Sequence, residues 1–189
     1  MNKQATAKAA TKLERLTRSV EAMKTAESSE AIEDAWVDFL IAASTFYSTL
    51  EQGAKTNDKS KAWFGRKKHE RRTDQLLRYL HHARNAEEHG IARITGRSNS
   101  KIFLKSKGAA VMLQSDGKNW NVVSQTGDVE YPGDVVTLVR VQDIRFGDWF
   151  DPPEQHLGQN LNDTSPPAIA ELGAAYLGEM LSEAKALPG

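Results

Sequence analysis

The spacing of apolar residues along the chain predicts four long amphipathic helices. In each segment apolar side chains recur every three or four positions, which places them on one face of a helix. The expected helices occupy residues 6–26, 29–52, 73–89 and 165–186. An isolated helix of this length is marginal in water, so each must bury its apolar face against a neighbour. The sequence therefore predicts a helical bundle.

Capping residues agree with these limits. Ser28 or Ser29 can accept a hydrogen bond from the first turn of the second helix. Gly90 follows the last apolar position of the third helix, and glycine is common where a helix ends. Ser165 precedes two prolines that suit the first turn of the fourth helix.

Between the third and fourth helices the pattern changes to short runs of β-branched and aliphatic residues, separated by Asp116-Gly117 and Gly127-Asp128 turns. The expected strands occupy residues 101–106, 109–115, 120–125 and 134–141. We expect an α+β fold: a four-helix-bundle core at 6–92 plus 165–186, a small antiparallel β-sheet insert at 96–150, and a linker loop at 151–164. The alternative is a helical N-terminal domain followed by a separate α+β domain.

Composition narrows the class of protein. The 189 residues suffice for one sizeable core, and 39% hydrophobic with 26% charged residues is ordinary for a globular protein. There is no cysteine, which excludes disulfides, thiolate metal sites and thiol nucleophiles. No apolar run approaches the ~18 residues of a membrane span, and the N-terminus lacks the apolar core of a secretory signal. We therefore expect a cytoplasmic protein.

The net charge is zero, but one stretch is strongly basic. Residues 55–72 carry eight Lys or Arg and two acidic residues. Its candidate RNA-binding residues are Arg66, Lys67, Lys68, Arg71 and Arg72. Such a local patch suggests an anionic partner at one place, with a solvated basic loop as the alternative. Trp63-Phe64 within it could stack on bases, but we favour an anchor to the core.

The candidate chemistry lies at the end of the third helix, in Arg84-Asn85-x-x-x-His89. At ~100° per residue, Arg84 lies ~40° from Leu80 and therefore points into or beside the apolar face. An unpaired guanidinium there would be costly, so it needs a partner or an anionic ligand. His89 lies ~140° around the helix from Arg84, so the two side chains are expected to diverge within one chain.

This motif resembles the signature of the HEPN superfamily, in which Arg, often followed by Asn, precedes His by a few residues at the end of a bundle helix. The resemblance covers roughly residues 10–92 together with the last helix, and the β insert is not part of the family's common core. It implies a metal-independent endoribonuclease that works as a homodimer, with an antitoxin or other protein as a further partner. His89 would transfer the proton of an attacking 2′-hydroxyl, Arg84 would hold the phosphate, and Asn85 would orient either group.

Several alternatives stay open from the sequence. Arg84 could simply pair with Glu88 one turn along the helix. A HEPN-like protein could also bind RNA or a nucleotide, or form a dimeric scaffold, without catalysis. A third alternative is an adaptor that uses the β insert and the Pro152-Pro153 loop. No cofactor is expected, and no metal site, because His82 and His89 are ~10 Å apart along the helix and cannot share one ion.

Overall fold

The computed structural model describes residues 1–98, 103–115, 117, 120–130, 135–143 and 146–188. In these residues four helices come first, short pairs of strands follow, and a fifth helix comes last, so the expectation of an α+β fold is confirmed, with helices predominant. The helices are α1 (Lys3–Thr25), α2 (Ser29–Ala54), α3 (Asp58–Thr73), α4 (Gln75–His89) and α5 (Pro166–Ala186). The chain divides into two compact units, Met1–Gly96 with Val136–Gly189 and, separately, Arg97–Val135.

The helix limits follow from side-chain caps. The Asn2 carboxamide oxygen accepts from the amides of Gln4 and Ala5 at the start of α1, and Ser28 accepts from Ala31 at the start of α2. Because these side chains satisfy amides that have no partner inside the helix, they fix where each helix begins. Ser165 precedes α5 as expected, but its side chain makes no capping hydrogen bond.

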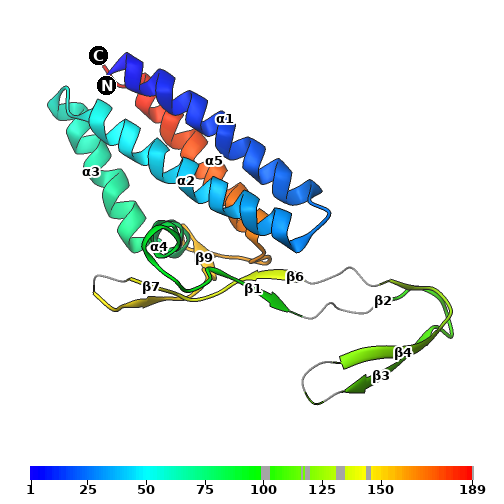
Figure 1. The fold of residues 1–189 in the computed structure, drawn as a ribbon. Coiled ribbons are helices and arrows are strands. Elements are labelled where there is room, and N and C mark those ends of the chain that lie inside the picture. The colour runs from blue at the N-terminus through cyan, green and yellow to red at the C-terminus, as the bar shows by residue number, and fades with distance from the viewer. Residues whose placement is uncertain (99–102, 116, 118–119, 131–134, 144–145, 189) are drawn as a thin grey trace. The chain divides into compact units, whose positions relative to one another are not determined.

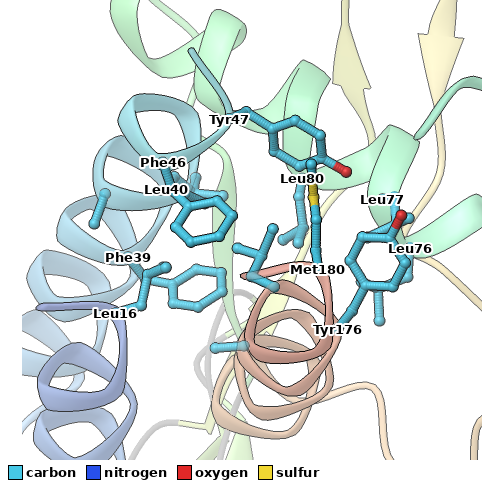
Figure 2. Close-up of a cluster of buried hydrophobic side chains, with 14 of the residues drawn as sticks. Leu16, Phe39, Leu40, Phe46, Tyr47, Leu76, Leu77, Leu80, Tyr176 and Met180 are labelled. Carbon is cyan, nitrogen blue, oxygen red and sulfur yellow. The ribbon is translucent and has the colours of Figure 1, made fainter. Parts of the chain in front are cut away.

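The apolar faces of the helices form one core. Helices α1, α2 and α5 lie side by side, whereas α4 is seen almost along its own axis and therefore crosses them (Figure 1). Phe39 and Phe46 of α2 lie near Leu80 of α4 and Met180 of α5, and all four are buried (Figure 2). The last helix is thus packed into the helical unit, as its apolar face predicts.

Helix α3 was not expected from the sequence. The basic stretch, considered as a possible solvated loop, forms a helix of 16 residues that begins after the Asn57 cap. Most of its positions are charged or polar, so it lacks the apolar periodicity on which the other predictions rest. Trp63 and Phe64 are buried, which confirms that they anchor this stretch to the core.

The strands of the helical unit are short. β1 (Thr95–Ser98), whose first two residues belong to this unit, pairs with β6 (Val135–Leu138). β7 (Val141–Gln142) pairs antiparallel with β8 (Trp149–Phe150), and β9 (Gln155–His156) pairs antiparallel with β10 (Gln159–Asn160). The last of these pairs lies within residues 151–164, which were expected to be a linker loop. Here the backbone folds back through Leu157 and Gly158, both with positive φ, in a two-residue hairpin turn.

The second unit is a set of antiparallel ribbons. β2 (Phe103–Leu104) pairs with β5 (Val129–Glu130), and β3 (Ala110–Ser115) pairs with β4 (Trp120–Thr126), with an irregularity after Met112. Among the described residues these are separate two-stranded antiparallel pairs, so the expectation of one small antiparallel sheet is corrected. The expected strand at 134–141 is divided between β6 and β7, and part of the one at 101–106 lies outside the described residues.

Candidate functional site

Helix α4 carries the Arg84-Asn85-x-x-x-His89 motif at its C-terminal end. Its start is fixed by Asp74, whose carboxylate accepts from the amide of Leu77 at 2.9 Å. Its end is fixed where the amide of Gly90 donates to Ala86, so His89 is the last helical residue. The buried residues Leu76, Leu77, Tyr79, Leu80 and Ala83 hold the helix against the core. The motif therefore lies at the point where α4 leaves the packed interior.

Arg84 points toward the core, as its position beside the apolar face predicts. Its side chain is 27% exposed and lines a pocket that α2, α3, α4 and α5 form together. Leu40, Leu77 and Leu177 supply apolar surface to this pocket. A guanidinium in such surroundings requires a negatively charged or strongly polar partner.

Glu88 is that partner, and it also contacts His89. One guanidinium nitrogen of Arg84, Nη1, forms an ion pair with Glu88 Oε2 and donates to Asn85 Oδ1 at 3.3 Å. His89 Nε2 lies 3.2 Å from the same Glu88 oxygen. The alternative of an Arg84–Glu88 pair is thus confirmed. The expected divergence of Arg84 and His89 is corrected, because both side chains reach one carboxylate oxygen between them.

The same pocket receives Arg71 from α3 and His81 from α4. The Arg71 guanidinium lies over the ring of Tyr47 at 4.7 Å from its centre, a cation–π contact. Burial lowers the pKa of His81 to about 4, and the positive charge of Arg71 acts in the same direction. His81 is therefore neutral at pH 7, and two guanidinium groups face a pocket with largely apolar walls. This combination suits an anionic group that is partly shielded from water.

The other candidate RNA-binding residues are distributed differently. Arg66 and Arg72 are exposed on α3, and Lys68 pairs with Glu51 of α2 at 2.7 Å. Lys67 is only 9% exposed and pairs with Glu70 at 3.3 Å and with Glu183 of α5 at 2.9 Å. Lys67 therefore holds α3 against α5, and any contact with RNA would require these pairs to break. Of the five, Arg71 is the residue that shares the Arg84 pocket.

His82 lies apart from this pocket. Its ring stacks on Phe150 of β8 with centroids 3.6 Å apart, and Nδ1 lies 3.3 Å from Asp143 Oδ2. Within the part of the chain that the structure describes, no group of three or more His, Asp or Glu residues is placed to hold a metal ion. None of the described helices is long and apolar enough to cross a membrane.

The sequence did not identify Ser44 and Tyr47 as neighbours of the motif, although both line the pocket with Arg84. They lie on a helix whose apolar stripe indicates only packing, and no local signal shows which of its turns faces α4. Glu88 was foreseen only as a partner of Arg84, whereas in the structure it also contacts His89.

Comparison of the chain with protein-family models, curated protein sequences and solved structures finds no match.

Proposed function

We propose that this protein is a HEPN-like, metal-independent endoribonuclease that uses Arg84, Asn85 and His89. One observation carries the proposal: the Arg84 guanidinium and the His89 imidazole both contact Oε2 of Glu88. A phosphate oxygen in place of that carboxylate oxygen would meet the same two groups. Arg84 would then bind the phosphate while His89 lies close enough to exchange a proton with a ribose hydroxyl.

The reaction that fits these groups is transesterification within RNA. The 2′-oxygen forms a bond to phosphorus, and the bond from phosphorus to the 5′-oxygen of the next nucleotide breaks. The imidazole of one His89 accepts the 2′ proton, and a protonated imidazole gives a proton to the leaving 5′-oxygen. Arg84 stabilises the charge that grows on the phosphate oxygens. The products are a 2′,3′-cyclic phosphate and a 5′-hydroxyl.

This proposal includes a homodimer. One imidazole cannot hold and release a proton in the same step, so two copies of His89 supply base and acid. A closed two-fold dimer with the C-terminal ends of both α4 helices at its interface would bring them together. The exposed position of His89, whose side chain is 63% exposed, leaves it accessible to such a partner.

A second function is favoured by the ion pair itself. If Glu88 stays on Arg84, the guanidinium is neutralised and no phosphate can replace it. The protein would then be a non-catalytic module that binds RNA through the exposed basic residues of α3, chiefly Arg66 and Arg72. Such binding depends strongly on salt, because it releases counterions from the phosphates.

The test is incubation of purified protein with single-stranded RNA in EDTA, followed by analysis of the product ends. We expect cleavage to fall at least ~100-fold in Arg84→Ala and in His89→Ala, the scale of a lost acid–base group. The matched controls are Arg18→Ala and His69→Ala, which remove the same side chains at exposed positions of α1 and α3. DNA of the same sequence should stay intact, since it lacks the 2′-hydroxyl.

Equal cleavage by wild type, Arg84→Ala and His89→Ala would refute the catalytic proposal. Salt-dependent RNA binding without any cleavage would instead favour the second function.

A further inference from the structure

A second pocket lies on another face of α4, between this helix and β8. Gln75 and Arg78 of α4 line it together with Trp149 and Phe150 of β8. Asp151 and Glu154, from the segment that follows β8, also line it. All of these residues belong to the helical unit. Neither Arg84 nor His89 lines this pocket, so the proposed catalysis does not account for it.

Two aromatic rings of the pocket are paired with arginines. Phe150 stacks on His82 and has the Arg78 guanidinium 5.5 Å from its ring centre. Trp149 is 50% exposed, and the Arg140 guanidinium lies 4.1 Å from its ring. A half-exposed tryptophan leaves part of its ring surface accessible to a flat ligand that can stack on it. Aromatic rings with adjacent arginines are typical of surfaces on which unpaired bases stack.

The polar groups of the pocket favour a base over a phosphate. Asp151 and Glu154 are exposed carboxylates, which repel phosphate but accept hydrogen bonds from N–H groups. The backbone amide of Glu154 donates to the Gln75 side chain at 3.1 Å, which ties this segment to α4. Guanine offers two adjacent N–H donors, N1–H and the N2 amino group, on its pairing edge. A carboxylate can accept from both when the base is unpaired.

We propose that this pocket binds one unpaired guanine base of single-stranded RNA. The base stacks on Trp149, its donor edge faces the carboxylates of Asp151 or Glu154, and Arg78 and Arg140 hold the flanking phosphates. This inference rests on the proposed RNA substrate and deepens it.

The pocket lies on the same helix as the proposed catalytic motif, so the separation of the two can be calculated from helix geometry. Arg78 and His89 are eleven residues apart, which brings them to within ~20° around the helix and separates them by ~16 Å along it. A strand bound at both places would span only a few nucleotides. Cleavage should therefore occur at a fixed short distance from a bound guanosine.

Binding can be measured separately from cleavage with fluorescently labelled 2′-O-methyl oligonucleotides, which have no free 2′-hydroxyl. Two probes are used with the full-length protein, an oligouridine and the same oligomer with one central guanosine. We expect the guanosine probe to bind more tightly. Trp149→Ala should weaken its binding about 5- to 150-fold, the range for loss of one base–aromatic stack. Trp149→Phe should retain part of the affinity, and Arg18→Ala should have no effect.

The role of the two carboxylates is tested by the preference of the protein for the guanosine probe over oligouridine, and not by affinity alone. The double variant Asp151→Asn/Glu154→Gln should lose the preference for the guanosine probe while its binding of oligouridine stays equal or becomes tighter. Equal binding of the two probes by wild type, or no effect of Trp149→Ala, overturns the inference. Binding of an arginine-rich peptide at Trp149 in place of either probe overturns it as well, since it would identify a protein partner.

Failure of the base-pocket inference can be distinguished from failure of the catalytic proposal. Loss of probe binding in Trp149→Ala together with unchanged cleavage by Arg84→Ala refutes the proposed role of Arg84 in catalysis and leaves the base pocket intact. Cleavage that depends on Arg84 and His89, with probe binding unaffected by Trp149→Ala, supports catalysis and refutes the base pocket.

Discussion

Replacement of Glu88 by glutamine tests whether its carboxylate occupies the place of an RNA phosphate. Glu88→Gln keeps the size of the side chain but removes the negative charge that Arg84 and His89 share. If the Arg84 guanidinium binds an RNA phosphate, Glu88→Gln should increase the affinity of the protein for RNA. If the ion pair is only a feature of the folded helix, RNA binding should respond no more than to any other lost surface charge.

The expected gain in free energy of RNA binding on Glu88→Gln has two contributions. A Glu–Arg pair four residues apart on a helix stabilises by about 0.4 kcal/mol, and the side chains here are 27% and 46% exposed, so a larger value is not expected. A carboxylate ~4 Å from a bound phosphate repels it by about 1 kcal/mol in a water-like environment. Glu88→Gln removes both the ion pair that competes with the phosphate and the repulsion of the phosphate. Together these lower the free energy of RNA binding by about 1.4 kcal/mol, which is about tenfold tighter binding.

The assay is fluorescence anisotropy with a 2′-O-methyl oligouridine at low salt, with Glu87→Gln as the matched control. Glu87 is exposed on the neighbouring position of α4, and its replacement changes the net charge equally. Glu88→Gln should bind about tenfold more tightly than wild type, and Glu87→Gln much less so because its charge is screened. An affinity of Glu88→Gln equal to or below that of Glu87→Gln would refute the reasoning and favour a structural ion pair.

Two further predictions concern the helical unit. In α5, a Cβ atom at Gly173 would lie 2.9 Å from Leu80 and 3.1 Å from the Phe39 ring, whereas at Gly178 the nearest atom is 3.9 Å away. Gly178→Ala should therefore stabilise by about 0.5–1 kcal/mol and Gly173→Ala should destabilise by about 1–2 kcal/mol in urea unfolding, and equal effects would contradict the close packing. Burial lowers the pKa of His81 from 6.5 to about 4, so the unfolded chain binds a proton that the folded chain does not as pH falls from 6.5 to 4. Stability should decrease over this window, His81→Gln should flatten the decrease, and an identical pH dependence in both proteins would refute the assignment.

The sequence predicted those helices whose apolar faces are regular. Leu76, Leu77, Leu80 and Ala83 mark the buried face of α4, and the same geometry correctly directed Arg84 toward the core. Helix α3 was missed because its buried positions include Ser60 and Lys67. A lysine can be buried when two carboxylates surround it, and those come partly from Glu183, more than a hundred residues away. No local pattern contains that information.

The candidate site was predicted only in part, because some of its contacts also depend on residues far apart in the sequence. The spacing of Arg84, Asn85 and His89 is local, so it can be read from the sequence. The angle around an ideal helix gave the direction in which the side chains leave the backbone, but not where their ends meet. A long glutamate between Arg84 and His89 joins them despite the angle of ~140°. The approach of Arg71 to the same pocket depends on how α3 packs against α2 and α4, which involves tertiary contacts alone.

The segments that hold α4 in place come from beyond the helices. The hydroxyl of Tyr79 donates to the carbonyl of Val139 at 2.7 Å, and Phe150 covers His82. At the start of the helix, Asp74 contacts His156 at 3.0 Å and accepts from the amide of Leu157 at 2.7 Å. These contacts fix α4 along its length, and with it the position of the motif at its end. Val139, Phe150, His156 and Leu157 therefore support the candidate site. A truncation aimed at the β-rich part of the chain must be confined to Arg97–Val135 if it is to test that unit and not the stability of α4.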